Sequence, residues 1–196
     1  MEKHHCHSKE MNDFKRKIEY LENADRNKNF TAEELLQMIP VKKSDSILDL
    51  GAGTGYLSIP AAKIVDNTVY ALDLDSKMLD FIESKARDRK ITNIKSLQGS
   101  IDNIPLSENS IDIILASLVL HEVNPLSKSL EQIKRVLKEG GYFLCLEFEK
   151  KELNSGHKAP PRIHSSEMEQ ELINAGFSIE KRLSLDDSLY IFIAQK

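Results

Sequence analysis

The chain has 196 residues, enough for one domain with a short appendage. Its 27 Lys and Arg residues and 31 Asp and Glu residues give a formal net charge of −4, which argues against a broad basic surface for nucleic acid or an anionic membrane. Two cysteines, Cys6 and Cys145, cannot build a disulfide framework. The longest apolar run, 113–120, is too short to cross a bilayer. The polar start lacks the apolar core of a signal peptide. We therefore expect a cytoplasmic protein with neither a membrane nor a nucleic acid as its partner.

The amino-terminal segment, residues 1–30, is expected to be a polar tail followed by a short helix, because apolar residues recur at helical spacing only within 14–29. The tail carries four residues that zinc, copper or nickel accept as ligands: His4, His5, Cys6 and His7. Four adjacent ligands on a chain end do not easily close a tetrahedron, so a weakly binding tail is the alternative and no metal is assigned.

From residue 31 to residue 148 the pattern alternates between helices and strands. Thr31 and Glu34 form a capping box for a helix that Pro40 ends. Short apolar segments predict strands at 46–50, 68–74, 94–98, 111–118 and 142–148. Helical periodicity predicts helices at 56–65, 76–90 and 126–137, the last ended by Gly140-Gly141. This alternation predicts an α/β fold with a doubly wound parallel sheet.

The carboxyl-terminal segment predicts a different ending for the sheet. A polar linker, 150–161, precedes a helix that a capping box of Ser166 and Glu169 opens. Strands at 177–183 and 189–194 follow, and the break between them is so short that they must form an antiparallel hairpin. The sequence thus predicts seven strands, mostly parallel, that end in a hairpin.

Three glycines, Gly51, Gly53 and Gly55, stand at every second position between the first strand and the next helix. Glycine lets a ligand approach the backbone, and a helix N-terminus offers N–H groups, so this loop suits a phosphate or a carboxylate. Asp73 closes the second strand, where a carboxylate can accept the hydroxyls of a ribose. Tyr56 stands where the dinucleotide fingerprint G-x-G-x-x-G has its third glycine, which disfavours a nicotinamide cofactor.

Several segments in the same order resemble the motifs of class I S-adenosylmethionine-dependent methyltransferases. They are DLGAGTG at 49–55, VYALDLD at 69–75, SIDIILAS at 110–117 with LHEV at 120–123, and RVLKEGG at 135–141. The LHEV segment and a Pro-Pro-x-x-His stretch at 160–164 resemble a group of small methyltransferases of uncertain substrate. The resemblance implies a Rossmann-like methyltransferase fold and S-adenosylmethionine as the cofactor.

The resemblance also implies a domain organisation. Residues 1–30 would be a tail and a capping helix outside a single methyltransferase domain, 31–196. Within this domain, 44–148 would be the cofactor-binding half, and 149–196 would supply a linker, a helix and the hairpin. The amino-terminal helix either closes over the cofactor, with Phe14, Tyr20 and Arg26 near its methionine end, or docks on the surface.

The resemblance assigns a cofactor site residue by residue. The strand end and the glycine loop would hold the amino acid portion of the cofactor, with Asp49, Gly51, Ala52, Gly53 and Gly55. Asp73 would bind the ribose, and the adenine would lie near Leu74, Met78, Ser100, Ile101 and Ala116. Ser100 departs from the family pattern, because an acid is usual there, and Met78 and Ile101 have ordinary core positions as their alternative.

A small-molecule methyl acceptor is expected. Residues 116–119, ASLV, lack the Asn/Asp-Pro-Pro-aromatic tetrad of amino-methylating DNA enzymes, and Cys145 inside a strand is expected to be a core residue. His121 and His164 are the candidate general bases, because His121 follows the fourth strand at the crevice of such folds. A packed or helix-capping histidine is the alternative for both.

Two other functions compete with methyl transfer. The first is a nicotinamide-dependent oxidoreductase, which the glycine spacing and the terminal hairpin disfavour. The second is a non-catalytic module that binds S-adenosylmethionine, since the shared motifs bind cofactor and perform no chemistry themselves.

Overall fold

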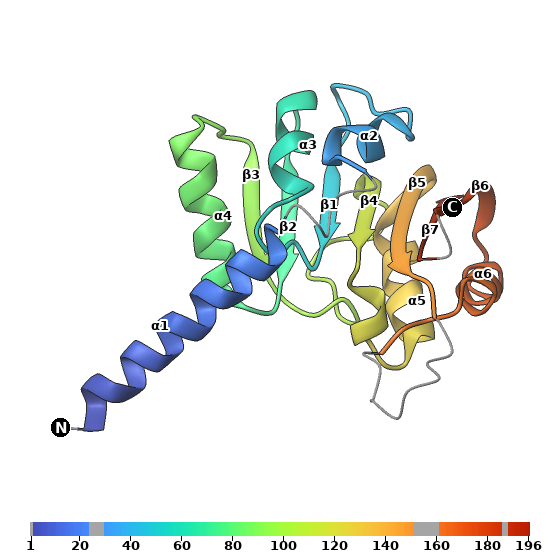
Figure 1. The fold of residues 1–196 in the computed structure, drawn as a ribbon. Coiled ribbons are helices and arrows are strands. Elements are labelled where there is room, and N and C mark those ends of the chain that lie inside the picture. The colour runs from blue at the N-terminus through green and yellow to red at the C-terminus, as the bar shows by residue number, and fades with distance from the viewer. Residues whose placement is uncertain (1, 24–29, 151–160, 186–187) are drawn as a thin grey trace.

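The computed structural model describes residues 2–23, 30–150, 161–185 and 188–196, with side chains in the first of these ranges from Met11 onward. Seven strands form one sheet in the order β3-β2-β1-β4-β5-β7-β6 (Figure 1). Their bounds are β1 Ile47–Leu50, β2 Val69–Asp73, β3 Ile94–Gln98, β4 Ile111–Ser117, β5 Leu137–Phe148, β6 Ser178–Leu185 and β7 Leu189–Gln195. The helices are α1 Glu2–Leu21, α2 Ala32–Gln37, α3 Ser58–Ile64, α4 Ser76–Asp88, α5 Leu126–Val136 and α6 Ser165–Asn174, with a 3₁₀ turn, η1, at Leu120–Glu122.

The sheet confirms the predicted topology. Strands β1 to β5 run parallel, while β7 is antiparallel to both β5 and β6 and lies between them. The hairpin therefore closes the sheet with its last strand inserted beside β5. The central strands β1 and β4 are buried on both faces, as their nearly continuous apolar sequences require.

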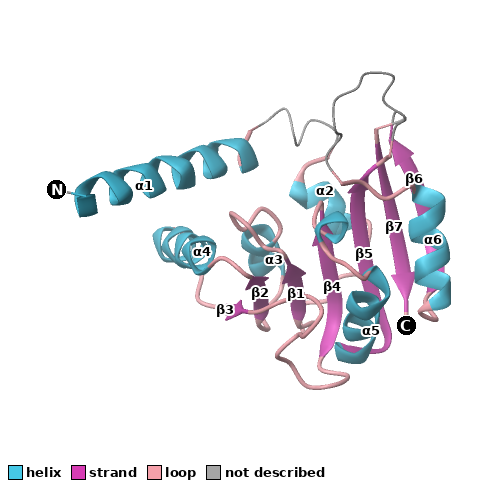
Figure 2. Cartoon of the chain, turned by 90° about the horizontal axis from the view of Figure 1, so that it is seen from below, coloured by secondary structure: helices cyan, strands magenta, loops and turns pink. Residues whose placement is uncertain are grey.

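Helices cover both faces of the sheet (Figure 2). Each face has its own apolar core. Helices α5 and α6 pack on one face against alternate strand residues such as Leu48, Ile114 and Phe143. Helices α2 and α3 pack on the other face against Ile47 and Ile113, which point the opposite way from their strand neighbours. This arrangement is the doubly wound fold that the alternating sequence predicts.

Two predicted boundaries were wrong: the bounds of the amino-terminal helix, and the start of the fifth strand, which is Leu137 rather than residue 142. Helix α1 spans Glu2–Leu21 rather than 14–29, so the residues assigned to a polar tail belong to the helix. Helix α5 passes into β5 at Leu137, and Gly140 and Gly141 lie inside that strand instead of ending the helix. The pairing of β5 with β4 shifts at this point, and a Cβ at Gly141 would lie 2.9 Å from a backbone oxygen of β4, so close strand approach explains that glycine.

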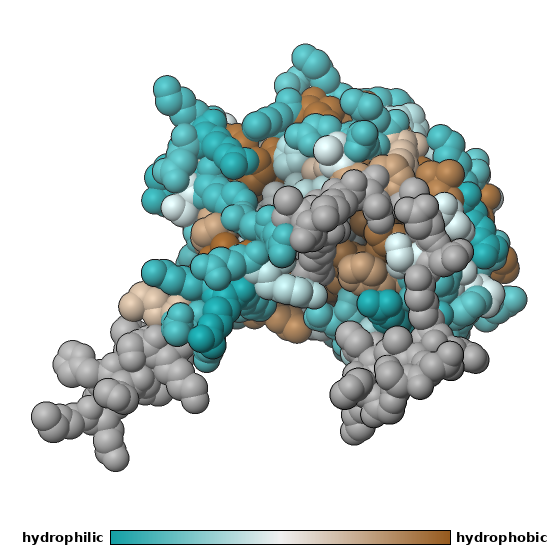
Figure 3. Space-filling model, in the orientation of Figure 1, coloured by the Kyte–Doolittle hydropathy of each residue, from teal (hydrophilic) through white to brown (hydrophobic). Residues whose placement is uncertain are grey.

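On the face that Figure 3 shows, hydrophilic side chains cover most of the described surface, and apolar side chains form smaller patches among them. Among the described residues, none of the helices has both the length and the apolar character needed to cross a membrane.

Candidate functional site

The glycine loop lies at the edge of the sheet where the parallel strands have their carboxyl ends. Gly51 has a φ of +61°, and a Cβ at this position would lie 2.3 Å from Cγ2 of Val119. Only glycine fits, because the backbone is left-handed and the segment after β4 packs directly against it. The loop is thereby held between β1 and the segment that leads into η1.

Asp73, at the end of β2, joins this loop to the next helix. Its Oδ2 accepts a hydrogen bond from the backbone N–H of Gly53 at 2.8 Å, and its Oδ1 accepts one from Asp75 at 2.9 Å. A carboxylate has about four lone-pair sites, so further acceptor capacity remains for hydroxyl groups. Leu74, the next residue, is 71% exposed and offers an apolar surface beside the carboxylate.

Asp49 lies behind the glycine loop on β1 and is buried. Its Oδ2 accepts a hydrogen bond from the Ser58 hydroxyl at 2.5 Å, which joins β1 to the start of α3. Burial away from water raises the pKa of Asp49 to about 7 and outweighs the hydrogen bonds from Ser58, which lower it, while the nearby charge of Asp73 raises it further. The site therefore holds one carboxyl group that titrates near neutrality.

A cavity of about 60 Å³ lies against the loop. It is lined by Leu21, Asp49, Gly51, Ala52, Gly53, Thr54, Tyr56, Leu57, Ser117 and Leu118. Leu21, the last residue of α1, is the only lining residue that comes from outside the α/β domain among those described. The end of the amino-terminal helix thus forms one wall of the cavity.

Helix α1 reaches the loop through apolar and charged contacts. Within its described side chains, the half-buried apolar residues are Phe14, Ile18 and Leu21, which share one face as the sequence predicts. Lys17 pairs with Asp75 at 3.0 Å, and Glu22, just after the helix, pairs with Lys85 at 2.7 Å. Lys85 also donates to the backbone oxygen of Thr54 in the glycine loop at 2.9 Å, so the helix end is tied to the loop itself.

The three residues predicted at the methionine end of the cofactor have different settings. Phe14 is half-buried, Tyr20 is 65% exposed, and Arg26 lies outside the described residues.

The other predicted cofactor residues divide into loop and core. The backbone N–H of Ala52 donates to Leu72 at 2.9 Å, and that of Gly55 donates to Ala52 at 2.8 Å, so both shape the loop. Three residues are almost fully buried in the core: Met78 at 0%, Ile101 at 6% and Ala116 at 1% exposure. Their contact with a cofactor stays a prediction.

Ser100, where an acid is usual in the family, is half-buried and lies beside Asp102. A hydrogen bond from Ser100 and the nearby ammonium of Lys128 lower the pKa of Asp102. The Lys128 ammonium is 3.0 Å from an oxygen of that carboxylate. Asp102 is thus engaged by Lys128 at the surface, while Ser100 as an adenine contact stays a prediction.

His121 is held by an acid that sequence reasoning missed. Its Nδ1 lies 2.7 Å from Oε2 of Glu147, and only 14% of its side chain is exposed. Glu147 is on β5, its side chain is 1% exposed, and its Oε1 accepts the backbone N–H of Leu120 at 2.7 Å. The signal in the sequence was a single acid within the otherwise apolar strand 142–148. A buried acid at such a position is unfavourable unless a hydrogen-bonding partner lies beside it.

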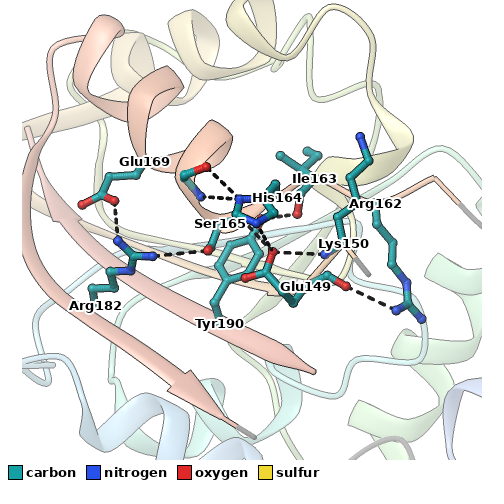
Figure 4. Close-up of polar contacts among 10 residues, drawn as sticks. Glu149, Lys150, Arg162, Ile163, His164, Ser165, Glu169, Arg182 and Tyr190 are labelled. Carbon is teal, nitrogen blue, oxygen red and sulfur yellow. Dashed lines mark hydrogen bonds and ion pairs between the residues drawn. The ribbon is translucent and has the colours of Figure 1, made fainter. Parts of the chain in front are cut away.

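His164, the second candidate base, lies at the start of α6, where Figure 4 shows its ring beside Glu149. It is the N-cap of that helix: its Nδ1 accepts the backbone N–H of Ser166 at 3.2 Å. The predicted cap, Ser166, is therefore wrong by two residues, because an imidazole nitrogen can accept this bond as a serine oxygen does. Its other nitrogen, Nε2, lies 3.8 Å from Glu149, so the capping alternative describes its setting.

The candidate metal ligands of the tail, His4, His5, Cys6 and His7, lie outside the described side chains. In the part of the chain whose side chains are described, no cluster of three His, Cys, Asp or Glu residues could hold a metal ion. Cys145 is fully buried in β5, as predicted for a core residue.

Comparisons with known proteins point to one family. A family model described as "Methyltransferase domain" matches residues 48–145. The chain is 36% identical over 113 residues to the ubiquinone/menaquinone biosynthesis C-methyltransferase UbiE of Haemophilus ducreyi, covering 56% of this chain and 44% of that protein. It is 32% identical over 117 residues to a demethylmenaquinone methyltransferase of Geobacillus, covering 59% of this chain and 50% of that protein. The chain thus spans about half the length of the curated relatives it matches.

Among solved structures, a SAM-dependent methyltransferase from Aquifex aeolicus superposes with a TM-score of 0.81 at 26% sequence identity. The match covers 91% of this chain and 96% of that one, so the two share one overall fold.

Proposed function

This chain belongs to the class I S-adenosylmethionine-dependent methyltransferase family, and we propose that it transfers a methyl group from that cofactor to a small-molecule acceptor. The observation that carries the proposal is the hydrogen bond between Gly53 and Asp73, which fixes a left-handed glycine loop beside a carboxylate with acceptor capacity to spare. Membership in this family argues against the alternative of a nicotinamide-dependent oxidoreductase, which the glycine spacing also disfavours.

The residues at the sheet edge fit this cofactor. Gly51, Gly53 and Gly55 carry no side chains and have positive φ values, so the loop can bring its backbone close to a ligand. Asp73 would accept ribose hydroxyls, and Leu74 would cover the adenine with its exposed side chain. Asp49 and the cavity beside it would receive the polar amino acid end, with α1 as a cap through Leu21. Residues 1–30 would then act as a cap on a single domain, 31–196.

When bound, the cofactor supplies a methyl group on a positively charged sulfur, which is already activated for displacement. The protein then has to orient the acceptor, exclude water and, where the attacking atom carries hydrogen, remove a proton. His121, at the carboxyl end of β4, is the residue we propose for that proton, because Glu147 fixes its ring. His164 is the weaker candidate, since its Nδ1 is engaged in capping α6.

The names of the relatives suggest the acceptor class to test first. By its name, one relative is a C-methyltransferase of ubiquinone and menaquinone biosynthesis, and the other methylates demethylmenaquinone. We therefore propose a reduced quinone ring as the first acceptor, because its ring carbon becomes a nucleophile when a hydroxyl loses its proton. A net charge of −4 supports a small molecule over nucleic acid.

Calorimetric titration with S-adenosylmethionine, S-adenosylhomocysteine and NAD tests the cofactor. We expect the first two to bind, and Asp73→Ala to weaken both at least about 100-fold, since it removes hydrogen bonds to a charged group. The matched control is Asp80→Ala, which removes an exposed acid from α4 and should leave binding unchanged. Binding of NAD alone would contradict the proposal.

Turnover then separates an enzyme from a non-catalytic module. The protein is incubated with S-adenosylmethionine and a reduced short-chain demethylmenaquinone, and separately with an extract of small metabolites. Release of S-adenosylhomocysteine supports methyl transfer, and the extract identifies the acceptor if the quinone is inert. Tight cofactor binding without release in either mixture would favour the module.

A further inference from the structure

We propose that Glu147 is the positioning residue of this site: it sets the tautomer of His121 so that Nε2 is the proton-accepting atom. The use of Nε2 as a base rests on the proposed function. The tautomer of His121 itself can be tested without any acceptor. The proposed functional group is thus a pair of side chains, His121 from the turn η1 and Glu147 from β5, rather than a single histidine.

Glu147 occupies a position that the sheet reserves for apolar side chains. It follows Phe143 and Cys145 along the same face of β5, and both are fully buried in the core beneath α5 and α6. An acid in such a place is unfavourable unless strong hydrogen bonds compensate its loss of hydration. Because the Glu147 side chain is only 1% exposed, its hydrogen-bonding partners have to replace the water that it loses.

Both carboxylate oxygens of Glu147 are engaged by one short segment. Oε1 accepts the backbone N–H of Leu120 at 2.7 Å, and Oε2 lies 2.7 Å from Nδ1 of His121. These two neighbours open η1, the turn that begins two residues after Leu118 at the cavity. The carboxylate therefore fixes both the turn and the ring that the turn carries.

An ionised carboxylate only accepts hydrogen bonds, so Nδ1 must carry the hydrogen. In the neutral imidazole the lone pair then belongs to Nε2, at the other side of the ring. The turn that carries this ring directly follows Val119, which packs against Gly51 of the glycine loop. Nε2 is thus the atom that the fold prepares as a base beside the proposed cofactor site.

The acceptor class follows from this arrangement. A base is needed only where the attacking atom loses a proton, as in a hydroxyl or a quinol ring activated through its hydroxyl. The acceptor's hydroxyl proton passes to Nε2, a bond forms between the acceptor and the methyl carbon, the carbon–sulfur bond breaks, and sulfur keeps the electron pair. Where the attacking atom is a quinol ring carbon, that carbon then loses its hydrogen as a proton and the hydroxyl oxygen regains one, which restores the aromatic ring. His121 returns the proton to solvent, so atoms and charge balance with no further reagent.

Long-range ¹H–¹⁵N correlation spectra of the full-length protein test the tautomer directly. The His121 ring signals are assigned by their loss in His121→Gln. At about pH 8 we expect the Nδ1–H form to exceed the Nε2–H form by more than about tenfold, because a hydrogen bond to a charged group favours it. A wild-type ring in the Nε2–H form would overturn the proposal.

The variant Glu147→Gln is expected to reverse the tautomer of His121. The N–H of Leu120 holds the amide oxygen, so the amide NH₂ must face Nδ1 and donate to it. His121 should then switch to the Nε2–H form, which cannot accept a proton at that atom. Glu122→Gln is the matched control, since its carboxylate is 3.9 Å from Nε2 and exposed, and it should leave the tautomer unchanged. An unswitched ring in Glu147→Gln would contradict the proposal.

Two further measurements keep the result interpretable. If Glu147→Gln does not fold, Glu147→Asp keeps the charge and should keep the Nδ1–H form, whereas its loss in a folded Glu147→Asp would count against the proposal. Calorimetry with S-adenosylmethionine should give the same affinity for wild type, Glu147→Gln and Glu122→Gln within about twofold, since no cofactor contact changes. Failure of the wild type to bind would refute the proposed function and leave the tautomer result standing.

Discussion

The two sides of the site are built from different kinds of chemical group. On the cofactor side, the glycine loop presents backbone N–H groups, and Gly53 donates one of them to Asp73. On the proposed acceptor side, two side chains from different elements, His121 of η1 and Glu147 of β5, lie 2.7 Å apart. Backbone groups are placed by the strand–loop–helix unit itself, whereas a side-chain pair depends on the positions of both elements and on both rotamers. Apart from Asp73, the proposed cofactor side therefore depends mainly on the backbone of the glycine loop, whereas the proposed acceptor side depends on two side chains.

The largest effect is expected where the backbone itself is disturbed, at Gly51→Ala. The new Cβ would meet Val119 at 2.3 Å in a left-handed conformation, so we expect a loss of stability of roughly 2–4 kcal/mol and of cofactor binding of more than about 100-fold. Thermal unfolding and calorimetric titration measure the two losses.

The double variant Gly51→Ala/Val119→Ala removes the steric part of this effect. It should recover part of the stability but not all of it, because the left-handed backbone still disfavours alanine. Unchanged binding in Gly51→Ala would show that side chains, and not the backbone, define the cofactor side.

A smaller effect, dependent on pH, is expected at Asp49. Its pKa is raised from 3.8 when unfolded to about 7 when folded, so the folded protein binds the extra proton between these values. Stability contributed by this group is therefore full below about pH 4, falls as pH rises towards 7, and is constant above it, a change on the order of 4 kcal/mol at most.

The variant Asp49→Asn should remove this pH-dependent change in stability. It should keep the hydrogen bond from the Ser58 hydroxyl, because an amide oxygen also accepts hydrogen bonds. Urea unfolding of both proteins at several pH values between about 4 and 8 gives the difference. A wild-type curve parallel to that of Asp49→Asn across this range would mean that Asp49 is ionised throughout.

The smallest effect is expected at His164, and it sharpens the contrast on the acceptor side. His164→Ala removes the N-cap of α6 and should cost about 1 kcal/mol, while His164→Asn keeps a capping acceptor and should cost less. Neither variant should change the release of S-adenosylhomocysteine with the identified acceptor by more than about twofold. A large fall in turnover for a stable His164→Asn would make His164 part of the acceptor site after all.

Most of the fold could be predicted from the sequence, because local sequence patterns determine most of its helices and strands. Strand β3 was predicted at its observed bounds, and β1, β2 and β4 within one residue at each end. The Thr31 capping box was also confirmed, with both of its hydrogen bonds present. Periodicity, capping and short connections act over a few residues, so they leave a clear trace in the sequence.

Three features were missed, each for a physical reason. The start of α1 carries no apolar periodicity, so the sequence did not mark it as a helix. The cap of α6 was placed at Ser166 instead of His164, because serine is the commoner N-cap residue. Glu147 was overlooked because its role depends on its partners, Leu120 and His121, which lie in the turn η1 and meet it only in the folded chain.

The sequence by itself therefore determined the doubly wound sheet, the terminal hairpin, the glycine loop and the acid that faces it. Only the tertiary structure decided which histidine is paired with an acid, which one caps a helix, and that the end of α1 lines the cavity beside the loop. The physical reason is range: backbone geometry is set by near neighbours, while burial and side-chain pairing are set by segments that meet only in the folded chain.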